Sequence, residues 1–126
     1  MAGDWNVFLS PTMDQKHYRN PEKYRSKTRE AIKSKMRTHT LSDVYREQHP
    51  TYSEYTFKDR AGSNTHSRLD YFLVDHETAS YTTKASIEPI TSPFDYSEIT
   101  ITVDFNKVKR GPCFWKFNNS HLESDI

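Results

Sequence analysis

The stretch SRLDYFLVD, Ser67 to Asp75, is dense in apolar and aromatic residues. A short, nearly continuous apolar run of this kind is typical of a strand that is buried on both faces. We therefore predict that it forms the central strand of a sheet. Residues 51–59, TYSEYTFKD, also read as a strand, and Gly62 and Asn64 between the two stretches suit a hairpin connection.

The segments on either side predict a mixture of helices and strands. Toward the C-terminus, residues 76–83 predict one helical turn, and residues 84–90 and 97–105 predict two further strands. Toward the N-terminus, residues 3–10 read as the end of a strand that leads into a loop. Asn20-Pro21 predicts the start of a helix that continues to Arg37, and residues 41–50 predict a second helix that stops at Pro50. The fold class is therefore α/β (α+β), in packed layers.

Composition limits the cellular setting and the size of the core. The chain has 126 residues, of which 33% are hydrophobic, so we expect a marginal core. We find no apolar run long enough to span a membrane and no secretory signal, which predicts an intracellular protein, nuclear or cytoplasmic and not secreted. A single cysteine, Cys113, excludes an internal disulfide framework.

Positive charge is concentrated in one segment of a chain whose net charge is only +1. Residues 15–37 hold nine Lys/Arg against two Glu, a net +7, so the remainder carries −6. A basic helix can contact the phosphates of DNA, although a solvated helix face explains the same pattern. The residues that we expect to contact DNA are Lys27, Arg29, Lys33 and Lys35, together with Arg68 outside this segment.

Three acidic corners lie at the ends of predicted strands. They are Asp4 with Asn6, Asp70, and Asp95 before Tyr96. Carboxylates in such positions can bind Mg²⁺ or orient a water molecule, and an asparagine amide can donate to a phosphate oxygen. Taken singly, each aspartate is more often a turn residue or a helix cap.

Four motifs follow one another along the chain: GDWN, HPTYSEYTF, SRLDYFLV and FDYSEITITV. In this order and at these spacings, they resemble the endonuclease/exonuclease/phosphatase superfamily. The similarity is to the C-terminal half of the apurinic-endonuclease-like domain of LINE-type non-LTR retrotransposons, where the motifs read GDFN, HP with YTW, SRLDYFLVS and SDH. The tail GPCFWKFNNSHLESD resembles the segment that leads toward reverse transcriptase in those proteins. We therefore expect a partial endonuclease domain over residues 1–108 and a linker over residues 109–126.

The resemblance implies a two-sheet α/β sandwich with outer helices and mostly antiparallel strands. It also implies a Mg²⁺-dependent attack of water on a DNA phosphodiester. By position, Asp4 matches the aspartate that activates water, and Asn6 the asparagine that holds the phosphate. Asp70 matches the partner of the catalytic histidine, and Asp95, also the candidate metal ligand, matches the acidic residue before that histidine. Here the histidine is replaced by Tyr96.

A phenol cannot supply the positive charge that an imidazolium brings to a phosphate. The chain also holds no sequence that matches the first half of the family's domain, which contributes a metal-binding glutamate. We therefore expect a truncated, inactive relative of these enzymes in which Mg²⁺ binding is doubtful. The alternatives are a non-catalytic module that binds nucleic acid or protein, and a fragment of an active endonuclease with missing N-terminal exons. Its partners would be DNA, and a missing N-terminal half or a second copy.

Overall fold

A computed structural model describes residues 1–59, 62–89 and 95–107. The predicted linker, residues 109–126, lies outside the described residues. In chain order the strands and helices are β1 (Ala2–Asp4), β2 (Gln15–Lys16), α1 (Ser26–Thr38), β3 (Leu41–Asp43), α2 (Val44–Gln48), β4 (Phe57–Lys58), β5 (His66–Ser67), β6 (Asp70–Asp75), α3 (His76–Tyr81), β7 (Thr82–Glu88) and β8 (Glu98–Val103). They are followed by a 3₁₀ turn, η1 (Phe105–Lys107).

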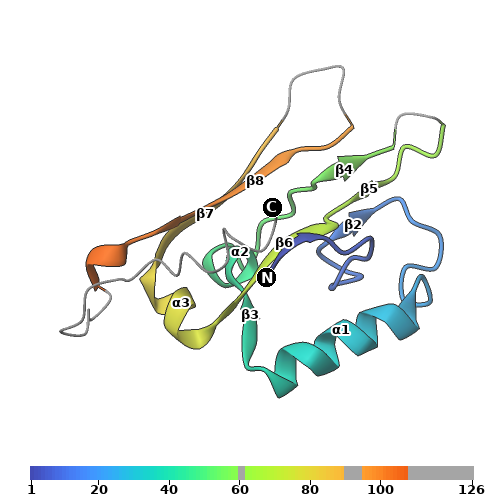
Figure 1. The fold of residues 1–126 in the computed structure, drawn as a ribbon. Coiled ribbons are helices and arrows are strands. Elements are labelled where there is room, and N and C mark those ends of the chain that lie inside the picture. The colour runs from blue at the N-terminus through green and yellow to red at the C-terminus, as the bar shows by residue number, and fades with distance from the viewer. Residues whose placement is uncertain (60–61, 90–94, 108–126) are drawn as a thin grey trace, which may run out of the picture.

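All strand pairs in the described residues are antiparallel, and they form three small sheets. The central sheet has the order β1-β6-β3, a second has the order β2-β5-β4, and β7 and β8 form a hairpin pair. Figure 1 shows α1 on one side of the central sheet and the β7-β8 pair on the other. The predicted mixed α/β architecture with mostly antiparallel strands is confirmed.

Strand β6 is the centre of the core, as its sequence predicts. Tyr71 and Leu73 project toward α1, where they pack with Leu9. Val74 and the half-buried Phe72 project the other way, toward α2 and the β7-β8 pair. Side chains alternate between the two faces of a strand, so one apolar run serves two core clusters.

No helix in the described part of the chain is long and apolar enough to cross a membrane.

Helix α1 begins at Ser26, five residues after the predicted start at Pro21. The reason is the buried side chain of Arg29, which is 3% exposed. Its guanidinium donates to the carbonyl oxygens of Pro21, Glu22, Tyr24 and Phe8 at 2.6 to 3.2 Å. These carbonyls are bound by a side chain, so residues 21–25 remain a series of turns and the prediction of helix there was wrong.

Residues 41–50 were predicted to form one helix, but they form a short strand followed by a short helix. Leu41 to Asp43 pair with β6 as β3, and the helix α2 begins only after Asp43, whose side chain accepts a hydrogen bond from the amide of Arg46. Asp43 is thus both the last residue of a strand and a helix N-cap, a role that suits aspartate. Val44 and Tyr45 face inward as expected.

Candidate functional site

The acidic residues predicted to act together are brought together by strand pairing. Strand β1 runs antiparallel to β6, and Asp4 is the direct cross-strand partner of Asp70. Directly opposed residues in an antiparallel pair project from the same face of the sheet. The carboxylates of Asp4 and Asp70 therefore emerge side by side at one end of the central sheet.

The loop that follows β1 places Asn6 beside Asp4. The backbone amide of Asn6 donates to Asp4 Oδ1 at 2.8 Å, which closes a tight turn, and Asn6 itself has a left-handed backbone with φ 54°. Asparagine tolerates this conformation better than most residues. Both side chains are exposed, so the amide and the carboxylate leave the end of β1 together.

Tyr96 lies near Asp4 and Asp70, and main-chain hydrogen bonds to β4 hold its segment in place. The amide of Ser97 donates to the carbonyl of Thr56 at 2.7 Å, and the amide of Lys58 donates to the carbonyl of Asp95 at 2.9 Å. The rings of Phe57 and Tyr96 are 5.1 Å apart, and Tyr96 is 46% exposed. The corner predicted from the sequence is therefore present, with a phenol at its tip.

The pKa of Tyr96 is affected by the neighbouring acidic residues. Partial burial raises the pKa of the Tyr96 phenol, and the negative charges of Asp4, Asp70 and Asp95 raise it further. A raised pKa means that the phenol stays protonated and neutral throughout the physiological range. The group at this position is a neutral hydrogen-bond donor beside three carboxylates.

Asp70 is the most constrained of the acidic residues. Its Oδ2 atom is buried and has no hydrogen-bond partner within the described residues. Burial raises the pKa of Asp70, a hydrogen bond with Thr56 lowers it, and the charge of Asp4 raises it, with a net upward shift. Thr56 is fully buried, and its hydroxyl oxygen also accepts from the amides of Leu69 and Asp70 at 2.9 and 3.3 Å. Thr56 therefore fixes the start of β6 and the position of the Asp70 carboxyl.

Asp70→Asn is expected to stabilise the fold at pH 7. The folded state binds the Asp70 proton more tightly than the unfolded chain does, because its folded pKa is raised, so ionisation above that pKa lowers stability. The advantage of the variant should shrink as the pH falls toward about 3.9, the ordinary pKa of aspartate. Thermal melts of both proteins between neutral and acidic pH measure this.

The matched control for this experiment is Asp75→Asn. Hydrogen bonds from Thr78 lower the pKa of Asp75, so its ionised form stabilises the fold at neutral pH and that stabilisation is lost on acidification. The two variants should differ from the wild type with opposite signs at pH 7. An Asp70→Asn protein that melts below the wild type at pH 7 and matches it at acidic pH would contradict the proposed environment of Asp70.

The residues present do not by themselves form a magnesium site. Within the described part of the chain, no three His, Cys, Asp or Glu side chains are grouped closely enough to hold a metal ion. Magnesium prefers near-ideal octahedral coordination by oxygen atoms. Asp4 and Asp70 offer carboxylates from adjacent strands, and Asp95 remains a candidate ligand from the sequence only.

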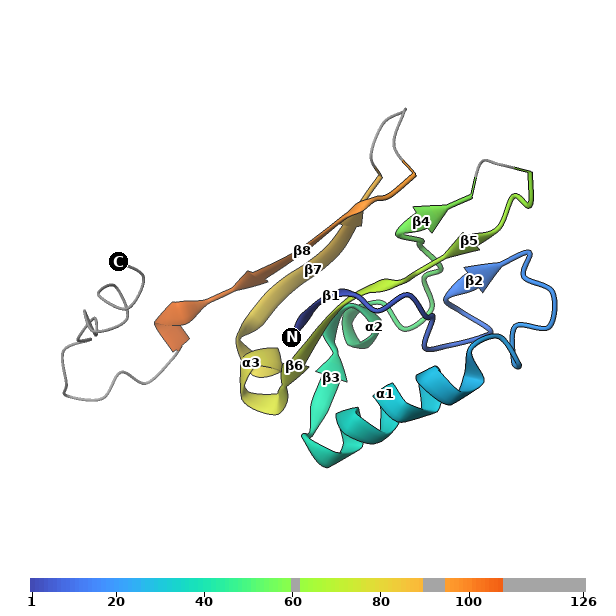
Figure 2. The ribbon, with the colours of Figure 1, turned by 45° about the vertical axis from the view of Figure 1, so that its right-hand side comes forward.

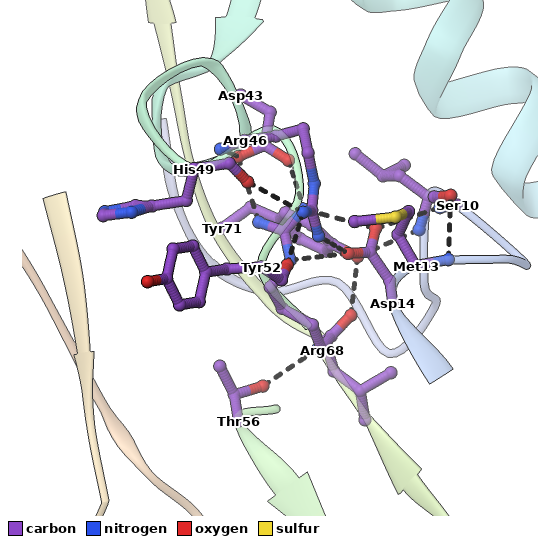
Figure 3. A network of polar contacts seen from close by, with 12 residues as sticks. Ser10, Met13, Asp14, Asp43, Arg46, His49, Tyr52, Thr56, Arg68 and Tyr71 are labelled. Carbon is purple, nitrogen blue, oxygen red and sulfur yellow. Dashed lines mark hydrogen bonds and ion pairs between the residues drawn. The ribbon is translucent and has the colours of Figure 1, made fainter. Parts of the chain in front are cut away.

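Arg68, predicted to contact DNA, is buried in an ion-pair network instead. It is 1% exposed, and its guanidinium binds Asp14 at 2.9 Å and Asp43 at 2.5 Å (Figure 3). Burial alone would lower the pKa of Arg68, but hydrogen bonds and charge from Asp43, and charge from Asp14, raise it. Arg46 adds a second cation to Asp14 at 2.5 Å. The network joins the loop after β1 to β3, α2 and the start of β6.

The prediction of DNA contacts by Arg29 and Arg68 was therefore wrong. Both guanidinium groups are buried, and their hydrogen bonds go to carbonyl oxygens or carboxylates of this chain. Lys27 and Lys35 are exposed on α1 and Lys33 is half-buried, so for these three residues contact with DNA stays a prediction.

A row of basic side chains that the sequence did not reveal crosses the second sheet. Lys16 on β2 and Lys58 on β4 are both direct cross-strand partners of His66 on β5. The three side chains therefore share one face, over about 10 Å at the usual strand spacing. We call Lys16, His66 and Lys58 the basic row. In sequence they are far apart, and only the register of three two-residue strands aligns them.

Comparisons with known proteins identify the fold. No family model matches the chain. A transposon TX1 uncharacterized 149 kDa protein from Xenopus laevis is 27% identical to it over 127 positions, which cover 99% of this chain and 9% of that protein. A 3′-5′ exonuclease, NExo, from Neisseria meningitidis has a TM-score of 0.65 at 22% identity, over 82% of this chain and 44% of that one.

Two other solved structures agree. The 3′ phosphatase NExo from Neisseria, bound to product DNA hairpin, has a TM-score of 0.66 at 21% identity over the same shares of the two chains. The AP endonuclease LMAP from Leishmania major has a TM-score of 0.64 at 23% identity, over 79% of this chain and 33% of that one. The chain thus spans less than half the length of the structures it resembles.

These findings confirm the resemblance that the motifs indicated. The chain has part of the fold shared by an exonuclease and an AP endonuclease, and its sequence is similar to that of a transposon protein.

Proposed function

We propose that this chain is a DNA-binding, catalytically inactive relative of Mg²⁺-dependent DNA endonucleases, encoded by a LINE-type retrotransposon. The observation that carries the proposal is the neutral phenol of Tyr96 beside Asp4 and Asp70, at the position where the resemblance implies a histidine. The similar transposon protein supports the origin, and the product DNA hairpin held by one similar structure supports DNA as the partner.

Tyr96 supports the absence of catalysis for an electrostatic reason. Cleavage of a phosphodiester develops negative charge, which enzymes stabilise with preorganised donors and cations. Near Tyr96 the charged groups are carboxylates, and the phenol cannot become cationic. An imidazole beside Asp70 would carry a positive charge near neutral pH. The corner therefore keeps its shape and lacks the charge that the chemistry requires.

The incomplete metal site supports the same conclusion. A metal ion would supply a Lewis acid and an activated water to this reaction class. The described residues bring two acidic side chains, Asp4 and Asp70, onto one face, and the raised pKa of Asp70 opposes the ionised form that a cation would bind. We therefore assign no hydrolytic step to this chain on its own.

The basic row is the best candidate for the contact with DNA. In the described residues neither Lys16 nor Lys58 forms an ion pair, and both are exposed. His66 lies between the two lysines, so an anion bound across the row would meet the positive charges of both Lys16 and Lys58. A hollow of about 390 Å³ next to it is lined by Lys58, Asp59, Gly62, Asn64 and His66.

The main chain of β4, which carries Lys58, also lies next to the acidic corner. The main chain of Lys58 bonds directly to Asp95, and Phe57, one residue earlier, packs its ring against Tyr96. Because successive side chains of a strand alternate, Lys58 projects from the face of β4 opposite to the Phe57 ring that contacts Tyr96. The exposed lysines of α1 lie on the opposite side of the central sheet from the β7-β8 pair and form the competing candidate surface.

The wild-type chain is expected to bind duplex DNA with an affinity that falls as salt rises. Two lysines that neutralise two phosphates predict a slope of about −2 for log K against log salt. Fluorescence anisotropy of a labelled duplex, titrated at several salt concentrations, measures the slope. Absence of binding at about 50 mM salt would refute the proposed DNA contact, since electrostatic binding is strongest at low salt.

A further inference from the structure

Strands β7 and β8 differ at their outer edges. Main-chain groups on the outer edge of β7 are bonded to side chains of α2, whereas those of β8 from Ile99 to Val103 pair with no strand in the described residues. On β7, Gln48 and His49 of α2 bind the main chain of Ala85. The amide of Ala85 donates to Gln48 Oε1 at 2.7 Å, and its carbonyl oxygen lies 2.8 Å from His49 Nε2. Figures 1 and 2 show β7 on the side of α2 and α3, with β8 outside it. Side chains therefore satisfy the β7 edge.

The contacts of Ala85 fix the orientation of the main chain on β8. Ala85 is the cross-strand partner of Ile101, and its own amide and carbonyl point away from β8. In an antiparallel pair of this kind, both residues direct their polar groups away from each other. The amide and carbonyl of Ile101 therefore point outward, and by alternation so do those of Ile99 and Val103.

Just before β8 begins, the same outer edge of the chain is already bonded to the β4 segment. Asp95 and Ser97, which have the same parity as Ile99, bond outward to Lys58 and Thr56 beside β4. Among the described residues no strand continues this pairing along Ile99 to Val103. An unpaired row of this kind is a template for a further strand.

The sequence of β8 is complementary to itself in one antiparallel register. We propose that two copies of this chain associate through β8, about a two-fold axis at Ile101. Ile101 then faces its own copy, and Ile99 faces Val103 of the second copy. Each of these residues exchanges main-chain hydrogen bonds with its partner, because their polar groups point outward. The result is a continuous four-stranded sheet with β7 at both edges.

Side chains fit the same register on both faces. Ile99, Ile101 and Val103 are half-buried in the single chain, and pairing would cover more of their apolar surface. On the opposite face Thr100 would lie against Thr102 of the second copy, an arrangement that is favourable in sheets. Glu98 would face Asp104, so salt should strengthen the association by screening this pair. The strand ends at Val103, and the chain then turns into η1 with Phe105 69% exposed.

Sedimentation equilibrium over a range of protein concentrations should show a monomer–dimer equilibrium that shifts toward the dimer at higher salt. Thr100→Lys with Thr102→Lys places introduced lysines opposite each other twice, and should weaken association by about tenfold. Thr100→Lys with Thr102→Glu places lysine opposite glutamate in the same register and should restore it. Circular dichroism checks that the hairpin is retained, since Lys84 lies opposite Thr102 within the chain.

A second variant tests the main-chain bonds. Val103→Pro removes an amide that points away from β7, a substitution that edge strands tolerate, and should weaken association about tenfold or more. Val103→Ala keeps the amide and should retain most of it. A monomer at every concentration would overturn the proposal, as would a dimer that is indifferent to both the lysine pair and the proline. If Thr100→Lys with Thr102→Lys weakens the dimer and Thr100→Lys with Thr102→Glu does not restore it, the proposed register is overturned.

Discussion

Replacing Arg68 with methionine is expected to lower the free energy of unfolding by about 3 to 5 kcal/mol. The guanidinium is 1% exposed and bound to the carboxylates of Asp14 and Asp43. It also lies 4.5 Å from the Tyr71 ring centre and 5.1 Å from that of Tyr45. Methionine fills part of the volume and leaves Asp14, which is 1% exposed, with Arg46 as its remaining cation.

The loss is large relative to the whole stability of a small domain, which is about 5 to 15 kcal/mol. Urea unfolding followed by circular dichroism measures it. Lys27→Met makes the same change of charge at an exposed position and should alter stability by less than about 0.5 kcal/mol. Adding Asp14→Asn to Arg68→Met should cost less than the sum of the single changes, because it removes the unpaired charge. A loss below about 1 kcal/mol for Arg68→Met would show that the network contributes little.

Removing the basic row is expected to weaken DNA binding on the order of 100-fold at about 50 mM salt. In the counterion-release relation each phosphate contact adds about 0.9 to the slope, so the loss of two contacts reduces affinity by roughly this factor at low salt. The variant is Lys16→Ala with Lys58→Ala. Its slope of log K against log salt should fall by about 2. Anisotropy titrations of the same labelled duplex supply both values.

The matched control is Lys27→Ala with Lys35→Ala, which removes the same charge from exposed positions on α1. It should bind DNA nearly as well as the wild type. If the α1 variant loses affinity and the row variant does not, the basic helix is the contact surface. Both variants should unfold at the same urea concentration as the wild type, because neither lysine pair is buried or paired in the described structure.

Strands β6 and β8 were predictable because their side-chain period is a local property. The apolar run of β6 and the alternation of β8 are both visible in the sequence and present in the fold. The acidic corner was also recoverable, since its residues stand at strand ends within recognisable motifs. Asp4 opposes Asp70, and Tyr96 lies near both.

The roles of the arginines could not be predicted, because they depend on contacts between distant residues. Arg68 binds Asp14 and Asp43, which are 54 and 25 residues away in sequence. Arg29 binds the carbonyl oxygens of residues 21, 22 and 24, which in the predicted helix would accept hydrogen bonds from backbone amides. The basic row was missed for the same reason, since the register of three short strands aligns Lys16, His66 and Lys58. Charge counted along the chain therefore did not show that Arg29 and Arg68 are buried or that the basic row exists.

The central claim is that this chain binds DNA and does not cut it. Incubation of increasing protein with supercoiled plasmid and Mg²⁺, analysed on one native gel, reads out both properties at once. We expect retarded supercoiled plasmid and no protein-dependent nicked circle, because Tyr96 is neutral and the described residues contain no group of three metal ligands. Nicking that requires Mg²⁺ and disappears on Asp4→Ala would contradict the account.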